Sequence, residues 1–117
     1  MNKPLGPYTP VVRAGDWVIV SGQLGLADGK MVEGGVLAET AQAMKNLKER
    51  LAEEGCDISD VQKTTLFILD MGQFGAINEV YVEALGDHRP ARSCIAVSAL
   101  PSGGQFEVEA WAYKPQS

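Results

Sequence analysis

The sequence predicts an α+β fold in which one β-sheet is covered on one face by two helices. Three observations predict it. The expected elements follow the order β-β-α-β-α-β-β, one strand pattern separates the two helical patterns, and 117 residues suffice for one hydrophobic core. No linker, repeat or low-complexity stretch divides the chain, so we expect a single domain over residues 1–117.

The first expected elements are two short strands. Residues 16–22 form an apolar, β-branched run that ends at a glycine, which is typical of a strand. Residues 10–13 precede Gly15, and we expect them to form a shorter strand that pairs with the strand over residues 16–22. Asp28-Gly29 predicts a tight turn.

Two segments show helical periodicity. In the first, apolar residues recur at steps of 4, 3, 3 and 4, and Gly55 supplies a C-terminal stop. The second helix is expected over residues 71–85, with apolar side chains along one side. The first stripe consists of Leu37, Ala41, Met44, Leu47 and Leu51, and the charged residues that mostly fall away from it are Glu39, Lys45, Lys48, Glu49 and Glu53.

The remaining strands are expected over residues 61–69, 93–100 and 106–113. Residues 66–69 are apolar in succession, so both faces of that strand require burial. Two helices can cover only one face. We therefore expect other copies of the chain to cover the second face, and the alternative is a long loop folded over a central strand.

Composition excludes several classes of protein. Ten Lys and Arg against fifteen Asp and Glu give a net charge of −5, which opposes non-specific nucleic-acid binding. No apolar run approaches the roughly 20 residues of a membrane helix. One histidine and two cysteines cannot supply a four-ligand zinc site, so no metal is expected. The N-terminus lacks an apolar signal-peptide core, and we expect a cytoplasmic protein with reduced thiols.

Arg92 and Cys94 are the first candidates for chemistry. They open an apolar strand after Pro90-Ala91, and alternation places them on one face. An arginine at this place is either a solvated edge charge or a clamp that holds a carboxylate through its planar fork. Cys94 is either an inert, partly buried thiol or a nucleophile, and the sequence places no histidine to activate it.

Carboxylates and strand ends supply the other candidates. Glu107 and Glu109 share one face of the last strand, where they are either solvated or face a pocket and move protons. Tyr8 lies in a rigid lead-in and is either a surface aromatic or a pocket wall. Ser21-Gly22 ends a strand, where backbone groups become free to bind a ligand.

The order of these motifs resembles the RidA/YjgF family of reactive-intermediate (enamine/imine) deaminases over essentially the whole chain. The resemblance implies a chorismate-mutase-like protomer with a mixed β-sheet, assembled as a homotrimer with clefts between subunits. The motifs are Gly6-Pro7-Tyr8, Val20-Ser21-Gly22-Gln23, Asp70-Met71, Asn78 with Tyr81, Pro90-Ala91-Arg92-Ser93-Cys94, Leu100-Pro101 and Glu107-Val108-Glu109.

The resemblance also implies an activity without a cofactor: hydrolysis of 2-imino acids, and of enamines such as 2-aminoacrylate, to 2-keto acids and ammonia. It assigns carboxylate binding to Arg92 and water activation to Glu107. The main-chain carbonyl of Cys94 would accept a hydrogen bond from the imine nitrogen. The remaining residues implied to line the cleft are Tyr8, Ser21, Gly22 and Asn78.

Two departures from the family pattern concern the cleft. Thr9-Pro10 stands where Ser-Gln commonly follows the Gly-Pro-Tyr motif, and eight residues separate Tyr81 from Pro90, fewer than in archetypal members. The shortened loop places the substrate range in question. Three alternatives stay open: a non-catalytic trimer that binds small carboxylates, the ribonuclease label of some relatives, and a pathway-specific branch such as pyrimidine breakdown.

Overall fold

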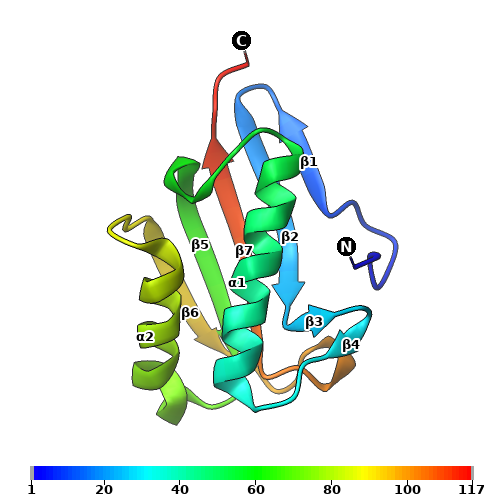
Figure 1. Ribbon diagram of the computed structural model, residues 1–117, viewed down its shortest axis with the longest axis vertical. Coiled ribbons are helices and arrows are strands. Elements are labelled where there is room, and N and C mark those ends of the chain that lie inside the picture. The colour runs from blue at the N-terminus through cyan, green and yellow to red at the C-terminus, as the bar shows by residue number, and fades with distance from the viewer. Residues whose placement is uncertain (1, 117) are drawn as a thin grey trace.

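The computed structural model describes residues 2–116 and confirms the α+β fold. Helices α1 (Val36–Glu53) and α2 (Phe74–Leu85) lie side by side on one face of a five-stranded sheet (Figure 1). The strand order is β1-β2-β7-β5-β6, and β5 and β6 run parallel while the other neighbours are antiparallel, so the sheet is mixed. The strands are β1 (Val11–Ala14), β2 (Trp17–Leu24), β5 (Val61–Ile68), β6 (Ala91–Ala96) and β7 (Phe106–Tyr113).

The hydrophobic core fills the space between the helices and the sheet. Strand residues alternate, so Leu66 and Ile68 of β5 are fully buried, as are Val108 and Ala110 of the neighbouring β7. The helices contribute buried residues such as Met44. At about 25 cal/mol per Å² of apolar surface, this layer is the main stabilising contribution to the fold.

The expected stripe of α1 is correct in its second half and wrong in its first. Met44 is buried, but Leu37 is exposed and Thr40 is buried in its place. Glu39, expected to face away, is only 3% exposed, and its carboxylate accepts hydrogen bonds from the backbone N–H and the side-chain amide of Gln105. These bonds offset the cost of burying the charge, which periodicity alone does not reveal.

The structure contains a short hairpin that the sequence did not predict. Strands β3 (Leu26–Ala27) and β4 (Lys30–Met31) are joined by the expected Asp28-Gly29 turn. Both turn residues have positive φ, 53° and 79°, as a type I′ turn requires. Two-residue strands carry no detectable alternation, so the sequence predicted the turn but not the pairing.

The expected strand over residues 93–100 is displaced. β6 begins at Ala91, and it ends at Ala96 because β5, its one partner strand within residues 2–116, ends at Ile68. The N–H of Val97 donates to the carbonyl of Ile68, and residues 98–100 pair with no strand in the described part of the chain.

The second helix also starts later than expected. A single 3₁₀ turn, η2 (Met71–Gln73), precedes α2, and the carboxylate of Asp70 caps it by accepting from the Gly72 N–H. The side-chain cap tightens the first turn, so the α-helical spacing begins only at Phe74.

No helix within residues 2–116 covers the second face of the sheet, which we call the open face. Trp17, Trp111 and Tyr113 are each about two-fifths exposed there, and the Trp17 ring packs edge-on against the other two. Phe67 points to this face as well, so the apolar run in β5 finds only one covering layer in the protomer. The long-loop alternative is not what residues 2–116 show, and self-association stays a prediction.

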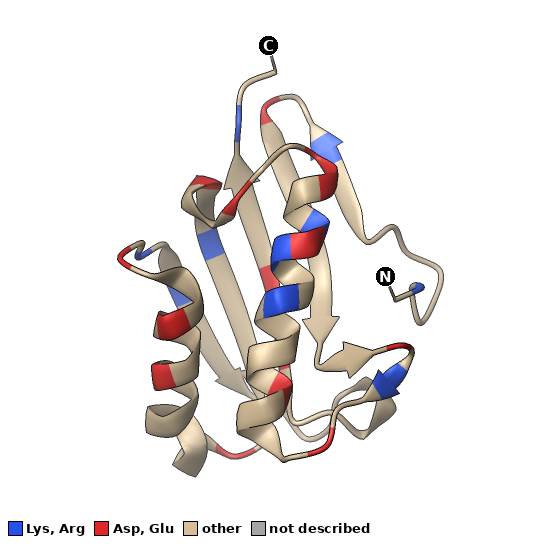
Figure 2. Cartoon of the chain, viewed as in Figure 1, with Lys and Arg blue, Asp and Glu red and all other residues tan. Residues whose placement is uncertain are grey.

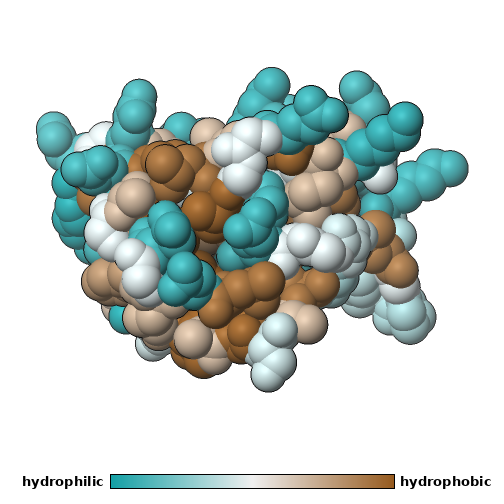
Figure 3. All heavy atoms as spheres, turned by 90° about the horizontal axis from the view of Figure 1, so that it is seen from below, coloured by the Kyte–Doolittle hydropathy of each residue, from teal (hydrophilic) through white to brown (hydrophobic). Residues whose placement is uncertain are grey.

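Lys and Arg alternate with Asp and Glu along α1 rather than forming a basic surface (Figure 2). Viewed from the lower end of Figure 1, apolar groups lie between polar ones (Figure 3). None of the described helices is long and apolar enough to cross a membrane.

Candidate functional site

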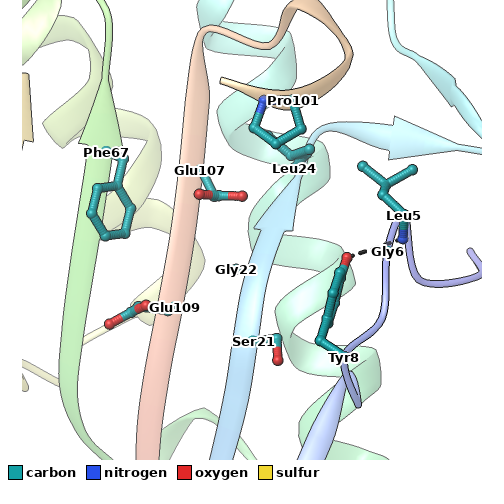
Figure 4. A pocket seen from close by; sticks show the side chains of 10 residues that line it. All are labelled: Leu5, Gly6, Tyr8, Ser21, Gly22, Leu24, Phe67, Pro101, Glu107 and Glu109. Carbon is teal, nitrogen blue, oxygen red and sulfur yellow. Dashed lines mark hydrogen bonds between the residues drawn. The ribbon is translucent and has the colours of Figure 1, made fainter. Parts of the chain in front are cut away.

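A cavity of about 510 Å³ lies on the open face, where β2, β5 and β7 meet residues 2–10, which we call the N-terminal arm (Figure 4). Strand β7 contributes both of its carboxylates to the wall, since Glu107 and Glu109 alternate with buried residues. The lining residues are Leu5, Gly6, Tyr8, Ser21, Gly22, Leu24, Phe67, Pro101, Glu107 and Glu109. Three of the four predicted cleft-lining residues, together with Glu107, therefore meet in one cavity.

A β-bulge in β2 explains why glycine stands at position 22. The register between β2 and β7 shifts between Val20 and Gln23, so Ser21 and Gly22 have no regular partners. A Cβ atom on Gly22 would lie 2.7 Å from both Cδ and Oε2 of Glu107, closer than atoms can approach. Glycine therefore allows the Glu107 carboxyl to lie directly against the β2 backbone.

The N-terminal arm is fastened at the cavity by short hydrogen bonds. The Ser21 hydroxyl donates to the Thr9 carbonyl at 2.7 Å, and the Ser21 N–H donates to the Pro10 carbonyl. The Tyr8 hydroxyl accepts from the Leu5 N–H at 3.1 Å, and its ring forms one wall of the cavity (Figure 4). Ser21 thus holds the N-terminal arm in place, and its hydroxyl proton is used in the hydrogen bond to Thr9.

The Glu107 carboxyl is suited to proton transfer. Burial raises its pKa above the usual carboxyl value, and the charge of Glu109 on the same face raises it further. A carboxyl with a raised pKa can both accept and return a proton closer to neutral pH. This is the electrostatic environment that a general acid or base requires.

Arg92 lies elsewhere, on the helix-covered side of the sheet. Its neighbour in β5 is the fully buried Thr64, and its guanidinium is 5.2 Å from the ring centres of both Phe74 and Tyr81. The Arg92 Nη1 donates to the Asn78 side-chain oxygen at 2.7 Å. Helix α2 thus holds the guanidinium between two aromatic rings and one amide.

Cys94 shares the Arg92 face, as expected, because it pairs with the buried Leu66. Its side chain is half-buried. Burial raises the pKa of the Cys94 thiol, and the nearby Arg92 charge opposes this shift. A raised thiol pKa disfavours the thiolate that nucleophilic chemistry requires.

The site residues predicted from sequence therefore form two separate groups in one protomer. Tyr8, Ser21, Gly22 and Glu107 are on the open face, whereas Arg92, Cys94 and Asn78 are on the opposite face. One chain alone does not bring Arg92 and Glu107 together. A ligand that touches both requires residues from two copies of the chain.

Several residues that surround Arg92 or line the open-face cavity were not predicted as site residues from the sequence. Phe74 and Tyr81 are separated from Asn78 by four and three positions, so one face of α2 carries all three. That spacing could have identified the surroundings of Arg92. By contrast, Leu5, Leu24 and Pro101 come from separate segments, and no sequence signal links them.

Within residues 2–116, no three histidine, cysteine, aspartate or glutamate side chains gather closely enough to hold a metal ion.

Similarity to known proteins extends over the whole fold. Residues 1–114 match the family model described as Endoribonuclease L-PSP. The 2-iminobutanoate/2-iminopropanoate deaminase of Mus musculus is 44% identical over 110 residues, which are 92% of this chain and 82% of the relative. The structure of RidA from the Antarctic bacterium Psychrobacter sp. PAMC 21119 superposes with a TM-score of 0.91 at 34% identity, covering 95% of this chain and 91% of that chain.

A ligand complex is among the similar structures. E. coli TdcF with bound serine has a TM-score of 0.88 and 32% identity, and the match covers 95% of this chain and 91% of that chain. Fold and similarity thus define a small α+β protein related to imine deaminases. The chain belongs to the Endoribonuclease L-PSP family, which is the YjgF/RidA family.

Proposed function

We propose that this protein is a 2-iminobutanoate/2-iminopropanoate deaminase that works without a cofactor as a homotrimer, with its sites in the clefts between subunits. The observation that carries the proposal is the half-buried Glu107 carboxyl, whose pKa is raised in the wall of the open-face cavity. The name of the mouse relative supports the reaction, and the serine complex of TdcF supports a small substrate with one carboxylate. We expect the protein to act in the cytoplasm.

Assembly joins the two halves of the proposed site. Another copy that packs on the open face brings its Arg92 to the cavity that contains Glu107. Burial of the exposed Trp17, Trp111 and Tyr113 would favour that contact. A light-scattering mass of three protomers at micromolar concentration is expected, and a mass of one protomer contradicts the proposal.

The proposed reaction begins with the substrate carboxylate on Arg92. The Glu107 carboxylate takes a proton from water while the water oxygen bonds to the imine carbon, and the C=N electron pair moves to nitrogen. Glu107 then returns the proton to that nitrogen. Glu107 next takes the proton of the new hydroxyl group and passes it to the amino nitrogen, the C–N bond breaks, and ammonia leaves as the oxygen electron pair forms the C=O bond of the 2-keto acid. Holding water and imine together supplies much of the rate.

The remaining residues position the substrate in this proposal. The Cys94 carbonyl accepts a hydrogen bond from the imine nitrogen, so its thiol does not react. Tyr8 covers the substrate, and Gly22 lets the Glu107 carboxyl approach the β2 backbone. Asn78 orients the Arg92 guanidinium.

Turnover of freshly generated imine tests the proposal. An amino-acid oxidase produces 2-iminopropanoate or 2-iminobutanoate from the amino acid, and loss of the imine is compared with loss in buffer alone. We expect faster loss with the protein and no acceleration with the Glu107→Gln variant. Binding of the keto acids without turnover by the wild type would instead identify a non-catalytic carboxylate-binding protein.

A further inference from the structure

The pocket around Arg92 contains a second arginine that the proposed reaction does not use. The pocket has a volume of about 300 Å³ and lies between α2 and the start of β6. Arg89 enters it from the short loop that follows α2. The full lining is Asn78, Tyr81, Val82, Arg89, Pro90 and Arg92, so both walls and both charges come from segments close in sequence.

Neither guanidinium in this pocket is neutralised within residues 2–116. The ion pairs of the described chain involve Arg13, Arg50 and Lys114 but not Arg89 or Arg92. The pocket lining contains no aspartate or glutamate. The exposed Arg89 and the half-buried Arg92 therefore present two cations in a pocket with otherwise apolar or neutral walls, where a dianion would meet no opposing charge.

Tyr81 provides a second sign that the two charges lie close together. Its hydroxyl bonds to the Thr64 hydroxyl at 2.6 Å beneath the pocket. Burial raises the pKa of Tyr81, and the positive charges of Arg92 and Arg89 both oppose that shift. Both guanidiniums thus act on one buried side chain.

The backbone holds the Arg89 guanidinium in a defined position. Its Nη1 donates to the carbonyls of Gly86 and His88 at 2.6 and 2.8 Å. Gly86 ends α2 with a φ of 66°, so the chain turns back sharply and the loop stays short. The Nε and Nη2 groups of Arg89 have N–H donors left for a ligand.

We propose that Arg89 is a specificity-determining residue that favours 2-imino acids with a second carboxylate on the side chain, such as the imines of aspartate and glutamate. Arg92 binds the carboxylate next to the reacting carbon, and Arg89 binds the side-chain carboxylate. This inference rests on the proposed function, because that function assigns the first carboxylate to Arg92. An apolar residue at position 89 would offer the second carboxylate no partner.

Calorimetry with stable product analogues tests the inference without turnover. We expect the wild-type protein, in its native assembly, to bind 2-oxoglutarate more tightly than 2-oxobutanoate. Arg89→Gln lowers the ratio of the two affinities about tenfold, the size of one charge-assisted hydrogen bond, and Arg89→Lys retains part of it. Lys48→Gln, which removes an exposed charge on α1, leaves the ratio unchanged and excludes a general charge effect.

In the binding experiment, two outcomes overturn the inference: equal wild-type affinities for the two keto acids, or an Arg89→Gln variant with an unchanged ratio of affinities, whether or not its thermal stability is lower. The second outcome would mean that Arg89 only stabilises the C-terminal end of α2 through its backbone hydrogen bonds. Failure of the proposed function looks different, because a protein that prefers 2-oxoglutarate through Arg89 but hydrolyses no imine is a binding protein. Hydrolysis of small imines without a dicarboxylate preference contradicts the inference alone.

Discussion

The Arg92 pocket and the open-face cavity differ in how they hold their charged group. On the helix side, the Arg92 guanidinium is fixed by the Asn78 amide and by the rings of Phe74 and Tyr81. On the open face, the Glu107 carboxyl is placed by the close approach of the Gly22 backbone. Side chains of α2 thus position the Arg92 guanidinium, whereas the backbone geometry of the sheet positions the Glu107 carboxyl.

The difference teaches that each half of the proposed site is prepared before the halves meet. Helix α2 orders the carboxylate-binding half within one protomer, and the β2 bulge orders the proton-transferring half on the other face. In the proposed trimer, assembly would bring together two preformed surfaces, which lowers the cost of ordering groups when substrate binds. Substitutions on the two sides should therefore change different kinetic constants.

Loss of the Arg92 guanidinium should have the largest effect. Arg92→Ala removes the charge-assisted pair to the only anion of a small imine, and such hydrogen bonds contribute about 1.5–3 kcal/mol each. We expect kcat/KM for 2-iminopropanoate to fall more than about a hundredfold while the light-scattering mass stays that of the wild type. Near-normal turnover would show that the carboxylate binds elsewhere.

Gly22→Ala tests the open face. The added Cβ would lie 2.7 Å from the Glu107 carboxyl and must displace it. We expect kcat to fall about ten- to a hundredfold with a smaller change in KM, since a displacement near 1 Å can cost that much. Gly75→Ala is the matched control, because a Cβ there meets nothing within 4 Å. Equal losses in both variants would contradict the role of the close approach.

Much of the fold could be predicted from sequence because periodicity reports burial. The alternation in β7 correctly placed Glu107 and Glu109 on one face, and the PARSC segment correctly placed Arg92 and Cys94 together. The expected strand over 93–100 was wrong because its length depends on where β5 ends. The sequence of β6 alone does not reveal its register with β5, which is distant in the chain.

The site was less predictable than the fold. Motifs identified the charged residues, but alternation within one strand says nothing about which face of the sheet another strand uses. The separation of Arg92 from Glu107 depends on the pairing of β6 with β5 and of β5 with β7. Glu39 shows the same limit, since the partner that allows its burial, Gln105, is 66 residues away.

Asn78→Ala should affect substrate binding more than chemistry. The variant removes the acceptor that orients Arg92 but leaves its charge and both aromatic rings in place. Loss of one hydrogen bond worth about 1 kcal/mol predicts a KM increase of about fivefold with kcat nearly unchanged. Glu83→Ala, an exposed change on the same helix, is the control. A selective fall in kcat would assign Asn78 to the reaction itself.

The smallest expected effect is on stability: Glu107→Gln, which abolishes turnover in the proposed function, should also give a small, pH-dependent gain in stability. The folded protein raises the pKa of the Glu107 carboxyl, chiefly through burial, so it disfavours the charged form relative to the unfolded chain. The wild type therefore loses stability as the pH rises from the ordinary value of 4.5 through the raised folded pKa, and the amide variant does not.

We expect the variant to unfold at a slightly higher temperature than the wild type at pH 8, with the difference shrinking as the pH falls through the raised folded pKa and lost below the ordinary value of 4.5. Both proteins are compared at one fixed concentration, because assembly shifts the apparent stability. Glu79→Gln, an exposed change on α2, controls for the loss of one negative charge. A variant less stable than the wild type at pH 8 would mean that the folded protein favours the Glu107 carboxylate, and the proposed proton transfer would lose its electrostatic basis.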